Sequence, residues 1–134
     1  MGKKAFKVFL YWKTLIWTGI ILYLCLLPAN EVKKIDILKF NNADKLVHFS
    51  MYFVLSFLLI YDNLSARQII PSKGLSIFYL PFTVTLFLGG SIELIQYFFI
   101  DSRDGSIFDM LANLSGMILG TLTFRLFLRY RKIS

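Results

Sequence analysis

Four long stretches of the chain carry almost no charged side chains, and this feature restricts the possible folds most strongly. They cover residues 14–30, 46–61, 76–100 and 107–126. The hydrocarbon core of a bilayer is about 30 Å thick, so a helix needs roughly 20 apolar residues to cross it. None of the stretches alternates polar and apolar residues with a period of two, as barrel strands do. The sequence therefore predicts an all-α polytopic membrane protein, a bundle of four transmembrane helices in a single domain, residues 1–134.

The composition agrees with a membrane protein. Of the 134 residues, 57% are hydrophobic and 17% aromatic, and the mean hydropathy of +0.64 lies far outside the range of soluble domains. The first stretch follows several lysines, as in a signal peptide, but no small-x-small cleavage site follows it. Because Cys25 is the only cysteine, an internal disulfide is excluded.

The basic residues predict how the chain crosses the membrane. Four spans place both termini and the loop near residues 62–73 on one side. That side carries ten of the fifteen Lys and Arg residues. Since Lys and Arg in short loops resist translocation, we expect the cytoplasmic (inner) membrane, with both termini in the cytoplasm. The net charge of +7 is then mainly a topology signal, and nucleic-acid binding is not predicted.

Residues 92–116 are unusually polar for such a chain. They contain four of the eight acidic residues, together with Gln96 and Asn113. With a rise of about 1.5 Å per residue, Glu93 and Gln96 fall in the outer half of the third span, and Asp109 falls in the outer half of the fourth. The intramembrane polar groups are therefore expected in one leaflet.

Helical spacing places these groups on shared faces. His48 and Tyr52 are spaced i, i+4, as are Asp44 and His48 if that helix begins early enough. On the fourth span one stripe holds Asp109, Asn113, Gly116 and Gly120.

Glycines predict where helices approach closely. Gly116-x-x-x-Gly120 would form a groove on the fourth span. Gly89-Gly90 is the expected matching site on the third span, where small residues would let another helix approach closely. Ser106 is the expected N-cap of the fourth span.

The polar residues also have purely structural interpretations. Asp109 would lie in the first turn of a helix, where the dipole favours negative charge. Gln96 and Asn113 could simply bond neighbouring helices together. Exposing Glu93 to lipid would cost about 2.5–3.5 kcal/mol, so this side chain is expected to turn inward.

The order and spacing of the polar positions resemble the VanZ family of small bacterial membrane proteins. The relevant segments are DKLVHFSMY at residues 44–52, ELIQ at 93–96, Arg103-Asp104, and DMLANLSGMILG at 109–120. The resemblance covers roughly residues 10–128 and implies a four-span topology. It also implies a possible link to the cell envelope and to resistance against the glycopeptide teicoplanin, with which the founding member is associated. It supplies no assigned reaction.

The intramembrane polar residues and the resemblance to the VanZ family together predict a polar pocket near the outer leaflet. This pocket is expected to bind or modify a membrane lipid or a lipid-linked envelope precursor. The expected ligand-binding residues are Lys45, His48, Tyr52, Glu93, Gln96, Arg103, Asp104, Asp109 and Asn113.

Other functions stay open. The first alternative is an intramembrane hydrolase or transferase in which His48 is the general acid/base, with Glu93 and Asp109 as further catalytic candidates. A proton relay and a purely structural polar core are the others. No cofactor is expected, and no metal either, because the chain has one histidine and no HExxH-like spacing.

Overall fold

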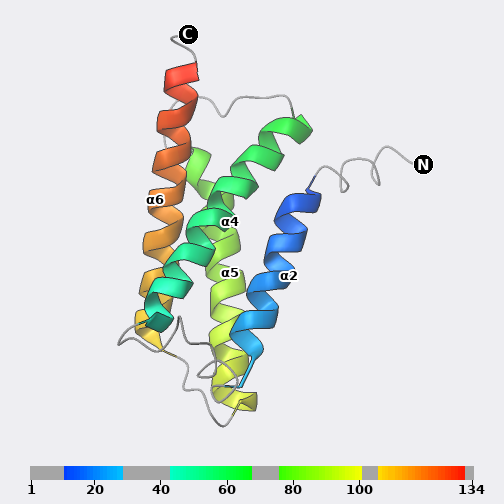
Figure 1. Ribbon diagram of the computed structural model, residues 1–134, viewed down its shortest axis with the longest axis vertical. Helices are drawn as coiled ribbons and strands as arrows, with labels where there is room; N and C mark the ends of the chain where they lie inside the picture. The colour runs from blue at the N-terminus through cyan, green and yellow to red at the C-terminus, as the bar shows by residue number, and fades with distance from the viewer. Residues whose placement is uncertain (1–10, 29–42, 68–75, 101–105, 132–134) are drawn as a thin grey trace, which may run out of the picture.

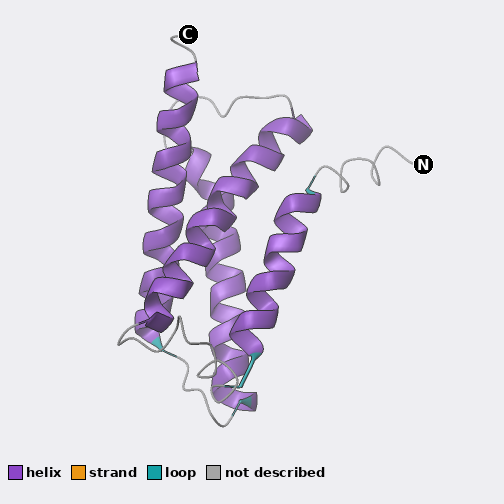
Figure 2. Cartoon of the chain, in the orientation of Figure 1, coloured by secondary structure: helices purple, strands orange, loops and turns teal. Residues whose placement is uncertain are grey.

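The described part of the chain forms four helices. The computed structural model describes residues 11–28, 43–67, 76–100 and 106–131. The helices are α2 (Trp12–Leu26), α4 (Ala43–Arg67), α5 (Ser76–Phe99) and α6 (Ile107–Arg131). These described segments contain no strand (Figure 2). The predicted all-α bundle is confirmed.

Consecutive helices run in alternating directions along the bundle (Figure 1). The start of α2 and the end of α6 therefore lie at the same end. At the other end, hereafter the polar end, α2 and α5 finish while α4 and α6 begin. α4 crosses the bundle obliquely, so that its first turns lie beside α6 and its last turns lie near the start of α2.

Helices α4 and α6 form the most extensive contact in the bundle, and two glycines make their close approach possible. A Cβ atom at Gly116 would overlap the backbone carbonyl of Phe49, and one at Gly120 would overlap the carbonyl of Phe53 and Oγ of Ser56. The predicted groove therefore exists, but the helix that fills it is α4, not the Gly89-Gly90 region of α5.

Gly89 and Gly90 of α5 instead face side chains of α6. A Cβ at Gly89 would lie 3.0 Å from Nδ2 of Asn113, and one at Gly90 would lie 3.8 Å from Cε of Met110. The glycines of α6 approach the backbone of α4, whereas Gly89 and Gly90 of α5 approach side chains of α6. The expected pairing of the two glycine sites was therefore wrong, although both sites do serve helix packing.

Three of the helices contain segments long and apolar enough to cross a membrane: Ala43–Ser65, Ile77–Phe99 and Ile107–Tyr130. α2 has only 15 residues, which corresponds to about 22 Å. It ends at Leu26, short of the predicted residue 30, because Leu27 is extended and the residue before a proline, here Pro28, is disfavoured in a helix.

Side chains of other helices satisfy both ends of α2. At its start, Oδ2 of Asp62 in α4 accepts hydrogen bonds from the backbone N–H (3.1 Å) and Oγ1 (2.8 Å) of Thr14. At its end, Nε2 of Gln96 in α5 donates to the carbonyl of Cys25 at 2.7 Å. A lipid environment offers no water to unpaired helix ends, so these bonds allow α2 to be short.

Apolar side chains fill the interior and cover most of the exterior. One core cluster, around Ile21, Tyr52 and Ile92, joins α2, α4 and α5. A second includes Phe124, whose ring lies 4.7 Å from that of Phe57 in an edge-to-face arrangement. Many large apolar side chains point outward, such as Phe87, which is 71% exposed. Such a surface suits a lipid environment.

Candidate functional site

Polar side chains from three helices meet at the polar end of the bundle. Asp44 and His48 lie in the first turns of α4, Asp109 and Asn113 lie in the first turns of α6, and Glu93 lies near the end of α5. His48, Asp109 and Asn113 are buried. The sequence prediction that helical faces of the second, third and fourth spans bring these groups to one end agrees with this arrangement.

His48 has a fixed orientation. Its Nδ1 lies 3.0 Å from Oδ1 of Asn113. An amide oxygen only accepts hydrogen bonds, so Nδ1 carries the proton and Nε2 is left with a lone pair in the neutral ring. Nε2 lies 4.0 Å from Oδ1 of Asp44, one helical turn earlier.

Asp44, His48 and Asp109 form a compact cluster. One ligand atom of each lies within 4.8 Å of the other two. The Asp44 side chain is 53% exposed, whereas the other two are buried. The cluster therefore reaches from the interior of the bundle to its surface.

Glu93 connects α5 to the start of α6. Its Oε2 accepts a hydrogen bond of 2.8 Å from the backbone N–H of Ser106. Ser106 is the N-cap of α6, as predicted, because its Oγ accepts from the N–H of Phe108 at 3.2 Å. Oε1 of Glu93 is buried and has no hydrogen-bond partner among the described residues. Its carboxylate is within electrostatic range of His48, Asp109 and Asp44.

Two further predicted residues are buried near this cluster. The Gln96 amide donates to the Cys25 carbonyl of α2, so it serves the packing of the bundle. The Tyr52 hydroxyl is buried without a hydrogen-bond partner in the described segments. It lies close to Gly89, as does Nδ2 of Asn113, since a Cβ atom at Gly89 would be 3.3 Å from the hydroxyl and 3.0 Å from Nδ2.

The cationic residues of the prediction are less well placed. Lys45 is half-buried, and its Nζ lies 6.0 Å from the centre of the Phe108 ring. Arg103 and Asp104 lie outside the described residues.

Asp44 is a member of the cluster that the predicted set of ligand-binding residues omits. The signal for it was its i, i+4 spacing with His48, which is informative only if the helix begins before residue 44. α4 begins at Ala43, three residues earlier than the predicted span, because hydropathy detects the apolar part of a helix and not its polar first turn.

A second polar cluster lies at the opposite end and was not predicted. Asp62 is fully buried, and besides bonding Thr14 it lies 3.6 Å from Nζ of Lys13. The neighbouring Asn63 accepts a hydrogen bond from the Tyr11 hydroxyl at 2.9 Å. These contacts join α4 to the start of α2, and 48 residues separate Thr14 from Asp62, so local spacing gives no sign of them.

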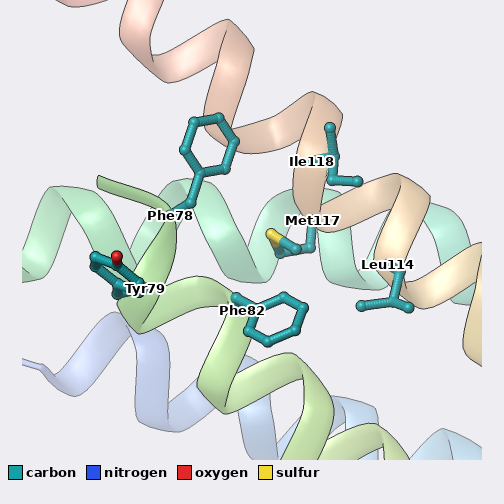
Figure 3. A pocket seen from close by; sticks show the side chains of 6 residues that line it. All are labelled: Phe78, Tyr79, Phe82, Leu114, Met117 and Ile118. Atoms are coloured by element: carbon teal, nitrogen blue, oxygen red, sulfur yellow. The ribbon is translucent and has the colours of Figure 1, made fainter. Parts of the chain in front are cut away.

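A groove of about 340 Å³ lies between α5 and α6, away from the polar cluster. Phe78, Tyr79 and Phe82 line one side, and Leu114, Met117 and Ile118 line the other (Figure 3). Its lining is almost entirely apolar, unlike the polar pocket that the sequence predicts. In a membrane such a groove suits an acyl chain, so it carries no information about a headgroup.

The cluster at the polar end combines a lone pair on imidazole with two carboxylates. Such groups can accept hydrogen bonds from a ligand, take up a proton, or coordinate a cation. No family model matches the chain, and neither a curated protein nor a solved structure matches it.

Proposed function

We propose that this chain is a VanZ-like protein of the cytoplasmic membrane whose polar end faces outward and binds the headgroup of a membrane lipid or lipid-linked envelope precursor. The observation that carries the proposal is the assembly of His48, Asp44 and Asp109 at one end of an otherwise apolar bundle. Ionisable groups within membrane spans are rare and usually mark functional sites.

A purely structural explanation accounts for only part of this assembly. It explains Gln96, which bonds α2, and Oε2 of Glu93, which caps α6. The grouping of Asp44 and Asp109, from different helices, with His48 is the part of the assembly that headgroup binding would use. Two carboxylates close together repel each other unless a cationic or hydrogen-bonding group lies between them.

The chemistry of the cluster indicates the class of ligand. Carboxylates and a neutral imidazole accept hydrogen bonds, so they favour a headgroup with hydroxyl, amide or ammonium donors. Lys45 at the same end, and Arg103 by the sequence prediction, would bind its phosphate. The orientation of the protein, with this end outside, is supported by the distribution of Lys and Arg.

The test is lipid retention by the purified protein. The wild type is reconstituted in nanodiscs containing phosphatidylethanolamine, phosphatidylglycerol and undecaprenyl phosphate, extracted into detergent, and analysed by native mass spectrometry. We expect one of these lipids to be retained by the wild type and by Ser115→Ala, an exposed position on α6 whose hydroxyl bonds only its own helix. His48→Gln and Asp109→Asn should lose it.

Equal retention by all four proteins, at matched thermal stability, would refute headgroup binding at this cluster. The proposed link to glycopeptides has its own readout, because the teicoplanin concentration that inhibits a sensitive host should rise when the wild type is expressed. If Asp109→Asn raises the inhibitory teicoplanin concentration as much as the wild type does, resistance does not depend on the polar cluster.

Acid/base catalysis by His48 is the second candidate, favoured by the Asn113 contact that leaves Nε2 as a base. Water is the expected nucleophile, because no serine of the chain lies in a recognised nucleophile motif. If turnover of a lipid ester or phosphodiester is found, its pH profile should lose one limb in His48→Gln.

A further inference from the structure

We propose that Asp44, His48 and Asp109 form a binding site for a divalent transition-metal ion, with Zn²⁺ as the best fit. The sequence argues against a metal because it contains a single histidine and no recognised motif. The fold brings one nitrogen and two carboxylates from α4 and α6 within 4.8 Å of one another. The site rests on the same side chains as headgroup binding but does not require that activity.

The distances suit a zinc ion after a small contraction. Zinc binds nitrogen and oxygen ligands at about 2.0–2.2 Å in a tetrahedron, so ligand atoms around it lie about 3.4 Å apart. Nε2 of His48 and Oδ1 of Asp44 are 4.0 Å apart, and all three ligand atoms lie within 4.8 Å of one another, so a pair has to approach by up to about 1.4 Å. Asp44 is the exposed member of the cluster, and rotation of its side chain can bring its carboxylate toward the two buried ligands.

Asn113 supplies an independent indication that His48 is a metal ligand. Metal-binding histidines usually donate the N–H of their second ring nitrogen to an oxygen, which fixes the ring and directs the other lone pair at the metal. Nδ1 of His48 has such a contact with Oδ1 of Asn113, at 3.0 Å. Asn113 is buried, with 1% exposure, and comes from the same helix as Asp109.

The ligand set selects among metals. One imidazole with two carboxylates suits Zn²⁺, Mn²⁺ or Fe²⁺, whereas copper(I) prefers thiolates and thioethers. Mg²⁺ prefers an octahedron of oxygens and many retained waters. Three protein ligands leave a coordination position for water or for the phosphate of a bound lipid, as in zinc sites that act on substrates. The exposed side of Asp44 is where that position would open.

The experiment uses the purified full-length protein in detergent without added lipid, so its outcome does not depend on headgroup binding. After treatment with a chelator and its removal, the protein is titrated with ZnCl₂ by calorimetry, and its melting temperature is followed with and without zinc. We expect one zinc per chain in the micromolar range or tighter, and a rise in melting temperature. MgCl₂ should produce neither effect.

Substitutions identify the ligands. Asn113→Ala should weaken zinc binding by about 10- to 100-fold, and His48→Gln, Asp44→Asn and Asp109→Asn by at least as much. Ser115→Ala is the matched control, because it lies on the same helix as Asp109 but is exposed and bonds a carbonyl of its own helix, and it should retain wild-type affinity within a few-fold.

Asp44→Asn keeps the test decisive if buried substitutions prevent folding. Its side chain is half exposed, so this variant should fold and, unlike the wild type, show no rise in melting temperature with zinc. Absence of saturable zinc binding in the wild type, or unchanged binding in Asp44→Asn and His48→Gln, would overturn the metal site. If zinc does not bind but the wild type still retains lipid, the metal site is refuted and the proposed headgroup binding is not. If zinc binds but no lipid is retained, headgroup binding is refuted and the metal site is not.

Discussion

Glu93 performs for α6 a task that usually falls to a residue of the same helix. In a capping box, the side chain three residues after the N-cap accepts a hydrogen bond from the N–H of the N-cap residue. That position after Ser106 is Asp109. Here the N–H of Ser106 is bound by Glu93 of α5. The Asp109 carboxylate lies in the cluster with Asp44 and His48.

This arrangement predicts a graded loss of stability at Glu93. Gln at this position keeps an oxygen that accepts from Ser106, whereas Ala leaves the N–H without an acceptor, at a cost of about 1–3 kcal/mol. A charged acceptor makes a bond roughly twice as strong as a neutral one. Melting temperatures in one detergent should therefore fall in the order wild type, Glu93→Gln, Glu93→Ala.

The neighbouring Leu94, 61% exposed on the outside of the bundle, is the control for that series. Leu94→Ala removes no hydrogen bond and should melt near the wild type. A Glu93→Ala protein as stable as the wild type would show that the cap contributes nothing.

Residue patterns predicted which side chains turn inward, but not what they bind. Asp109 and Asn113 share a face at spacing i, i+4, and both are buried. The bonds of Glu93 and Gln96, by contrast, end on backbone groups of Ser106 and Cys25. Every residue has such backbone groups, so the sequence contains no signal that marks these two as partners.

At the scale of helices, α4 and α6 depend on glycine where their backbones meet. Gly116 and Gly120 face backbone atoms of Phe49 and Phe53. A methyl group cannot be accommodated against a backbone by rotating a side chain. The helices would have to separate, and the cluster formed by their first turns would separate with them.

Gly116→Ala should therefore destabilise the bundle by about 1–3 kcal/mol, the usual range for overpacking, and should also weaken zinc binding. Gly19→Ala is the matched control in α2, because a Cβ there meets nothing within 4 Å, and it should cause no loss of stability. Thermal melts and zinc titrations of the two variants compare the effects. A Gly116→Ala protein that behaves like Gly19→Ala would contradict the close contact of α4 with α6.

Hydropathy located the four helices but misjudged where they end. The predicted span 46–61 corresponds to α4, which continues through Asp62 and Asn63 to Arg67. Those polar residues stay helical because Asp62 bonds the start of α2 and Asn63 bonds Tyr11. Tertiary contacts of this kind do not appear in a count of apolar residues.

The whole molecule has two chemically different ends. One end gathers Asp44, His48 and Asp109 around a site that reaches the surface, whereas the buried Asp62 at the other end bonds only to hold α2 in place. The two ends also differ in the basic residues near them, with Arg125 and Arg129 on the last turns of α6. An asymmetric protein of this kind needs one fixed orientation in the membrane.

That orientation can be measured with single cysteines. Cys25 is buried and is first replaced by alanine, after which Phe99→Cys marks the polar end and Tyr130→Cys marks the end at which α6 finishes. Both positions are highly exposed, at 80% and 73%. The proposed orientation, with the basic end in the cytoplasm, predicts that a membrane-impermeant maleimide labels Phe99→Cys in intact spheroplasts and Tyr130→Cys only after permeabilisation. The reverse pattern would place the cluster in the cytoplasm, where its ligand would have to be an inner-leaflet lipid.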